Sequence, residues 1–273
     1  MTDLHNAGGI PALLEALRPL LKLDALTVTG QTLGQALDEA AFRPFPLSSQ
    51  VIRPLDDPLY PAASLCVLRG NLAPDGAVIK ASASKDRRLL RHRGRAVVFA
   101  GAADMARRID DPALDVDKDC VLVLQGIGPI GFDSPGMPEA GLIPIPRKLG
   151  ARGVTDMLRL SDGRMSGTAG GSIVLHIAPE AAIADSVLGI VQDGDVIVCD
   201  VEQRRLEVEL SEEEIAARIA DRKSRLDGKK AARGPADRRR QPSRGYRGLY
   251  ERCVTQAQHG VDFDFLGADG ARI

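Results

Sequence analysis

The chain has 273 residues, enough for about two domains or one large one, and its 44% hydrophobic content is ample for a buried core. Its 36 basic and 37 acidic residues give a net charge of −1, which gives no basis for predicting nucleic-acid or membrane binding. No apolar run approaches the ~18 residues of a transmembrane helix. Residues 1–6 lack the basic-then-apolar order of a signal peptide, so we expect a cytoplasmic protein.

The first segment, residues 1–45, has helical periodicity. Pro11 suits a first helical turn, and leucines from Leu13 to Leu21 recur at helical spacing. Thr32 is placed to cap a second helix over 33–40. A proline-rich stretch at 46–61 then predicts an extended linker and a domain boundary.

Residues 62–228 alternate short apolar runs with turns and helical segments, which predicts an α/β barrel-like domain. We expect a turn at 71–76, a helix ending near 152–153, and a solvated basic turn at 85–95. The predicted strands are 64–68, 77–81, 96–100, 120–124, 156–160, 172–177, 196–201 and 206–210, and the predicted helices include 102–109 and 212–225.

The last part of the chain divides into a basic linker at 229–243 and a tail at 244–273. A solvated linker is favoured over an RNA contact. Three cysteines lie in apolar runs and no two cysteines are close in sequence. This favours reduced, buried thiols for Cys66, Cys120 and Cys199, and none of the four cysteines, Cys253 included, is expected to bind iron.

Residues 161–172, Ser-Asp-Gly-Arg-Met-Ser-Gly-Thr-Ala-Gly-Gly-Ser, form a loop rich in glycine and hydroxyl groups between two predicted strands. Such a loop can bring backbone N–H groups and hydroxyls close to an anion or a polyol. A tight turn with solvated serines explains the same composition. Glu139 ends a second loop, residues 126–139, which is rich in glycine and proline. A carboxylate that stabilises a helix N-terminus would also explain a glutamate at this position.

Four stretches resemble, in order and spacing, the dihydroxy-acid dehydratase/phosphogluconate dehydratase family. They are residues 23–30, 68–76, 134–139 and 161–168. Members are iron–sulfur hydro-lyases that convert 2,3-dihydroxy acids to 2-keto-3-deoxy acids. The resemblance implies a C-terminal β-barrel flanked by helices, like the swivelling domain of aconitase-like enzymes. It also implies that 1–45 is the tail of a mostly missing N-terminal α/β domain.

The resemblance assigns roles to four residues. Ser166 matches the catalytic base, acting as an alkoxide, and Thr168 matches the hydroxyl residue that assists it. Arg164 belongs with these two in binding substrate, and Glu139 matches a carboxylate ligand of Mg²⁺. The ligands of the iron–sulfur cluster, 2Fe-2S or 4Fe-4S, belong to the missing domain. The loop after 126 departs from the family pattern, with Ile130 where lysine is usual.

Met165 to Thr168 resembles the sugar-acid branch, so an aldonate such as arabonate or xylonate is the favoured substrate. Two alternatives stay open: a dihydroxy-acid dehydratase of branched-chain amino-acid synthesis, and a non-catalytic truncated domain. We expect the chain to be inactive alone, to need a separate N-terminal half, and to form a homo-oligomer.

Overall fold

The computed structural model describes residues 1–39, 50–59, 64–132, 135–167, 170–231 and 244–266. The chain divides into two compact units, Met1–Ala63 and Ser64–Ile273. Residues 46–49, 60 and 61 of the predicted linker, most of the basic linker at 229–243 and the end of the tail lie outside the described residues. No helix in the described ranges has both the length and the apolarity needed to cross a membrane.

The first unit is built of short helices, α1 (Thr2–Asn6), α2 (Gly9–Ala16), a 3-10 turn (Arg18–Leu20) and α3 (Leu33–Glu39). The predicted helix through Leu21 is wrong beyond residue 16, because Pro19 lacks an N–H and its ring disfavours a continuing α-helix. The predicted cap is confirmed, since Thr32 Oγ1 accepts from the Gln35 N–H at 3.2 Å.

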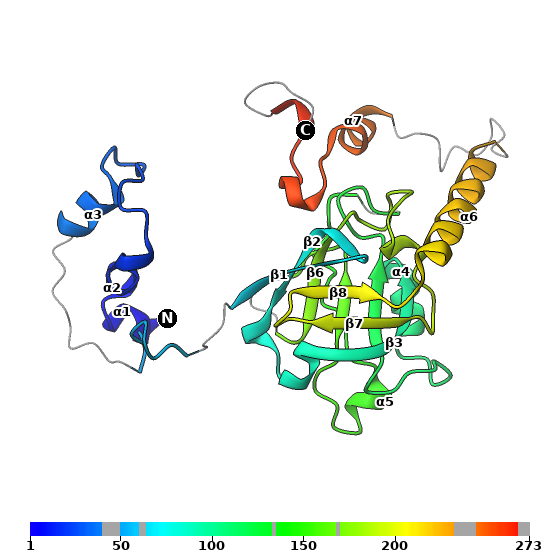
Figure 1. Cartoon of the computed structure of the whole chain (residues 1–273), viewed down its shortest axis with the longest axis horizontal. Coiled ribbons are helices and arrows are strands. Elements are labelled where there is room, and N and C mark those ends of the chain that lie inside the picture. The colour runs from blue at the N-terminus through cyan, green and yellow to red at the C-terminus, as the bar shows by residue number, and fades with distance from the viewer. Residues whose placement is uncertain (40–49, 60–63, 133–134, 168–169, 232–243, 267–273) are drawn as a thin grey trace. The chain divides into compact units, whose positions relative to one another are not determined.

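The second unit is a closed barrel of eight strands, which confirms the predicted barrel-like domain (Figure 1). Around the barrel the order is β1-β2-β6-β5-β4-β3-β7-β8. The strands are β1 (Leu65–Gly70), β2 (Ala73–Lys80), β3 (Arg91–Ala100), β4 (Val121–Gln125), β5 (Arg159–Ser161), β6 (Ile173–Ala178), β7 (Val196–Asp200) and β8 (Arg205–Val208).

Helices and 3-10 turns connect and flank these strands. The helices are α4 (Ala102–Arg108), α5 (Arg147–Gly150), α6 (Glu212–Ala231) and α7 (Gly245–Cys253). The 3-10 turns are Ala81–Ala83, Arg87–Leu90, Leu188–Ile190, Ala257–His259 and Asp264–Leu266. Ser211 caps α6 as predicted, accepting from the Glu214 N–H at 3.2 Å.

Strands β3, β4, β5 and β6 run parallel to one another. The pairs β1–β2, β2–β6, β3–β7 and β7–β8 are antiparallel, and a parallel pair, β1–β8, closes the barrel. Strand β4 is buried on both faces. Val121 and Val123 belong to one apolar cluster with residues of the other strands, and Leu122 and Leu124 belong to a second cluster that includes Leu149 of α5. Burial on both faces explains its continuous apolar sequence.

Several predicted boundaries are wrong for identifiable reasons. Strand β3 begins at Arg91 rather than Ala96, because the arginines of the basic run pair with acidic residues, as Arg93 does with Glu209. Strand β2 begins at Ala73 and includes Pro74, Asp75 and Gly76, which were predicted as a turn. The helix expected to end near 152–153 is only the short α5.

The connection from β5 to β6 has to return to the starting end of the barrel, because the two strands are parallel. Residues 162–172 make this return without a helix among their described residues. The glycine- and hydroxyl-rich loop is therefore a crossover between parallel strands rather than a hairpin turn.

Candidate functional site

The ends of β4, β5 and β6 lie at one end of the barrel, because these strands are parallel. The chain leaves them into three loops, which begin at Gly126, Asp162 and Pro179. Residues that follow the carboxyl ends of parallel strands are a common location for ligand sites. The predicted site residues lie in the first two loops.

Asp162 ties these loops together. Its carboxylate accepts from the backbone N–H groups of Gly126 at 2.9 Å, Ile127 at 3.0 Å and Ala181 at 2.8 Å. Burial raises the pKa of Asp162 to about 6. The three N–H groups oppose that rise, and the negative charge of Glu180 adds to it. Asp162 is therefore a structural clamp between the three strand ends.

Glu180 fixes residues 130 and 131 of the loop that begins at Gly126. It accepts from the N–H groups of Ile130 and Gly131, both at 2.8 Å, and from the Gln256 amide at 2.7 Å. A Cβ at Gly128 would lie 2.7 Å from Glu180, so only glycine fits there. Residues 126–131 have the spacing of an anion-binding glycine loop, but the protein's own carboxylates already occupy several of its N–H donors.

Glu139 and Arg164 meet, although 24 residues of chain separate them. Arg164 Nη1 lies 3.3 Å from Glu139 Oε2, and both side chains are 48% exposed. Arg164 Nε also donates to the Met137 carbonyl at 2.9 Å, and the Gly141 N–H donates to the Arg164 carbonyl at 2.8 Å. The loop that carries Glu139 is thus fastened to the crossover loop.

Ser166 follows Arg164 by two residues and is partly exposed. The next carbonyl, that of Gly167, accepts from Lys80 Nζ at 3.4 Å. Thr168 lies outside the described residues. Among the predicted site residues, the structure brings together Glu139 and Arg164 and places Ser166 on the same loop as Arg164.

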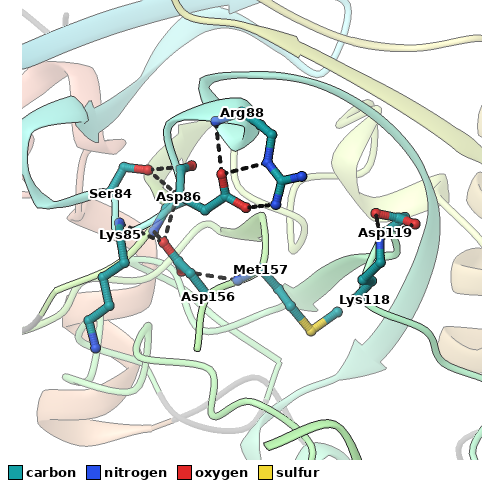
Figure 2. A network of polar contacts seen from close by, with 9 residues as sticks. Ser84, Lys85, Asp86, Arg88, Lys118, Asp119, Asp156 and Met157 are labelled. Atoms are coloured by element: carbon teal, nitrogen blue, oxygen red, sulfur yellow. Dashed lines mark hydrogen bonds and ion pairs between the residues drawn. The ribbon is translucent and has the colours of Figure 1, made fainter. Parts of the chain in front are cut away.

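The far end of the crossover is fixed by a buried polar network that sequence reasoning missed. Asp156 accepts from Ser172 Oγ at 2.9 Å, from the Lys85 N–H at 3.0 Å and from Arg159 Nη2 at 2.8 Å. Figure 2 shows the Lys85 side chain pointing away while its backbone N–H donates to Asp156. Burial opposes ionisation, but these contacts outweigh it and hold the pKa of Asp156 below its usual value.

Gly171 is also essential to this end of the loop. A Cβ there would lie 1.9 Å from Arg159 Nη2, and its φ of 123° is one that L side chains rarely adopt. Two charged residues inside an otherwise apolar predicted strand, Asp156 and Arg159, were the sequence signal that could have revealed the network.

The cysteines do not fit an iron–sulfur cluster. Cys66, Cys120 and Cys199 are buried, as predicted. Burial raises the pKa of Cys120 to about 11 and that of Cys199 to about 12, which disfavours the thiolate that a metal requires. Within the described ranges, no three His, Cys, Asp or Glu side chains are grouped to hold a metal. Glu139 fits Mg²⁺ as one oxygen ligand.

Fold and site together define an α/β barrel domain with a short glycine-rich crossover beside an exposed carboxylate–arginine pair. Residues 50–261 match the family model described as dihydroxy-acid/6-phosphogluconate dehydratase, C-terminal. The chain therefore belongs to this family of dehydratases, as its motifs suggested.

Three relatives show the range of the family. The 6-deoxy-6-sulfo-D-gluconate dehydratase of Pseudomonas putida is 44% identical over 99% of this chain and 44% of its own length. The L-arabonate dehydratase of Azospirillum brasilense is 44% identical over 100% of this chain and 45% of its own. The dihydroxy-acid dehydratase of Ignicoccus hospitalis is 42% identical over 81% of this chain and 38% of its own. The chain spans less than half the length of these relatives.

Proposed function

We propose that this chain forms the C-terminal part of a hydro-lyase that dehydrates a 2,3-dihydroxy acid, a sugar acid of the aldonate type, to a 2-keto-3-deoxy acid. The observation that carries the proposal is the contact between Glu139 and Arg164. It joins the loop bearing the family's metal-ligand position to the loop bearing the proposed base. Family membership supports the reaction class.

The reaction removes a proton from C2 and the hydroxyl from C3. Ser166 is the proposed base. A serine hydroxyl is a very weak acid, so its alkoxide needs nearby positive charge to become accessible. Lys80 supplies one such charge, because its ammonium group donates to the carbonyl of Gly167, the residue that follows Ser166. Thr168 is proposed to assist Ser166 through its hydroxyl.

Arg164 is proposed to bind the substrate carboxylate, because a guanidinium forms paired hydrogen bonds to carboxylate oxygens. In the structure Glu139 holds one of its N–H groups. Mg²⁺ bound at Glu139 would supply positive charge to the carboxylate and the developing enolate. Glu139 would then turn toward the ion and leave that guanidinium N–H for substrate.

An aldonate is favoured because relatives named for sugar acids match almost the whole chain at 44% identity. The proposal includes an N-terminal region of the enzyme, on this polypeptide or another, that carries the iron–sulfur ligands, and assembly as a homo-oligomer. A branched-chain dihydroxy acid is the second candidate substrate, supported by the Ignicoccus hospitalis relative.

The test uses the native protein, isolated without oxygen from its source cell together with whatever co-purifies. Formation of 2-keto acid is measured from L-arabonate, D-gluconate and 2,3-dihydroxy-3-methylbutanoate. We expect turnover of an aldonate that a chromosomal Ser166→Ala substitution abolishes and that Ser64→Ala, at an exposed position outside the site, leaves intact.

Three results would count against the proposal. Turnover of the branched acid alone would select the second substrate. Wild-type turnover by the Ser166→Ala protein would remove Ser166 as the base. No turnover of any acid by the native assembly would favour a non-catalytic domain.

A further inference from the structure

The side chain of Gln256, in the C-terminal tail, contacts Glu180 at the end of the barrel that carries the candidate site. Gln256 Oε1 accepts from the Glu180 N–H at 2.9 Å, and Gln256 Nε2 donates to Glu180 Oε1 at 2.7 Å. One amide thus binds both the main chain and the carboxylate of Glu180, which requires a group that is donor and acceptor at once. Glu180 is 1% exposed, so its carboxylate depends on partners that the protein supplies.

Gln256 belongs to a folded part of the tail, residues 245–266. An isolated bridge pairs Val254, before Gln256, with Phe263, after it. The Phe263 ring packs edge-on against Tyr250 of α7, with 5.8 Å between the ring centroids. These contacts fix the backbone on both sides of Gln256, so the amide is preorganised to bind Glu180.

The carboxylate of Glu180 is shared between the tail and the loop that follows β4. Its Oε1 accepts both from Gln256 and from the Ile130 N–H, and its Oε2 accepts from the Gly131 N–H. The close approach of Gly128 leaves no room for a Cβ beside this carboxylate. Loss of the Gln256 amide would leave one oxygen with fewer donors and the carboxylate free to turn.

The same loop is bonded across to the residues that carry the candidate site. The Pro129 carbonyl accepts from the Gly136 N–H at 2.8 Å. The carbonyl of the next residue, Met137, accepts from Arg164 Nε at 2.9 Å, and Arg164 in turn contacts Glu139. A shift of the loop at residues 129–131 would therefore move the groups that orient Arg164.

We propose that Gln256 is a positioning residue: through Glu180 it holds the loop that carries Glu139 in the conformation in which Glu139 meets Arg164. Without the amide, Glu180 would turn away from the N–H groups of the loop. The roles of Glu139 and Arg164 toward metal and substrate rest on the proposed function, whereas the holding of the loop does not.

The positioning is measured as amide hydrogen exchange by NMR on the full chain. Gln256→Met keeps the length of the side chain and removes both of its hydrogen bonds. We expect exchange about tenfold faster at Ile130 and Gly131, the effect of weakening one charged hydrogen bond, and faster exchange also at Met137. Val198, on β7 across the barrel from β6, should exchange as in the wild type, which separates the effect from global destabilisation. Faster exchange in the tail alone would overturn the proposal.

Gln258→Met is the matched control. Gln258 lies two residues further along the same tail, and its amide contacts Asp75 at 3.3 Å at an exposed position. We expect wild-type exchange at Ile130 and Gly131 in this variant. Equal acceleration by Gln258→Met and Gln256→Met would mean that any disturbance of the tail loosens the loop, and would refute a specific role for Gln256.

Gln256→Glu gives a second readout should Gln256→Met misfold. At pH 8 the introduced carboxylate places a like charge against Glu180, whereas at pH 5 the two carboxylates can share one proton. Asp162 and Tyr250 are the other titratable groups close enough to feel the charge of Glu180, so each rate is compared with that of the wild type at the same pH. We expect faster loop exchange at pH 8 and near-wild-type exchange at pH 5, and equal ratios at both pH values would contradict the proposal.

The functional part is measured as KM against kcat for an aldonate on the native assembly. We expect Gln256→Met to raise KM about tenfold with a smaller change in kcat, and Gln258→Met to leave both unchanged. Faster loop exchange with an unchanged KM would instead refute the substrate role of Arg164, and with it that part of the proposed function.

Discussion

Replacing Arg159 with methionine removes one partner of a buried ion pair. Arg159 Nη2 lies 2.8 Å from Asp156 Oδ1, and the two side chains are 5% and 0% exposed. Removing one partner of a buried pair typically costs about 3–5 kcal/mol, because the other charge stays buried. Asp156 keeps its hydrogen bonds from Ser172 and Lys85, so we expect the lower end, about 3 kcal/mol.

The assay is urea unfolding of the purified chain at pH 7, followed by circular dichroism. Arg93→Met is the control, because Arg93 and Glu209 form an ion pair of similar length at the surface, 64% and 41% exposed. Arg93→Met should lower the free energy of unfolding by only about 0–1 kcal/mol. Equal costs for the buried and exposed substitutions would refute the reasoning.

Three further predictions follow from the same structure. The raised pKa of Asp162, about 6, means that the folded state binds this proton more tightly than the unfolded state. Its contribution to stability is therefore full below the unfolded pKa near 4 and is lost as pH rises through 6. Measured by urea unfolding, the stability of wild type relative to Asp162→Asn should fall by about 2–3 kcal/mol between pH 4 and 7, and a flat difference would contradict the assignment. Gly171→Ala should lower the free energy of unfolding by at least about 2 kcal/mol in the same assay, because the added Cβ would meet Arg159. The control is Gly153→Ala, at another positive φ with open space around it. Iodoacetamide at pH 8 should modify Cys253 first in the native chain, with the modified residue located by peptide mass; early modification of a barrel thiol would contradict the burial of Cys66, Cys120 and Cys199.

The barrel could be predicted from the sequence because its strands are short apolar runs separated by turn residues. Strand β4 was found almost at its true bounds, since a fully buried strand has a distinct composition. Strand β3 was cut short, because a run such as Arg91 to Arg95 resembles a surface loop until its acidic partners are known. Local composition does not reveal partners that are distant along the chain.

The site was predicted only in part for the same reason. Motifs identified Glu139, Arg164 and Ser166 separately, but the contact between Glu139 and Arg164 depends on how two loops fold over the barrel end. Asp162 and Glu180 were missed because acidic residues after strands are usual turn residues. Only the backbone N–H groups that converge on them reveal their role.

The crossover from β5 to β6 also limits how this protein can be re-engineered. A connection between parallel strands usually needs a dozen or more residues, and residues 162–172 fall just short of that length. Deleting residues from the loop would pull β6 out of register with β5 and open the barrel. Loop exchanges between members of the family should therefore succeed only at equal length, and shortened loops should yield insoluble chains rather than folded, inactive ones.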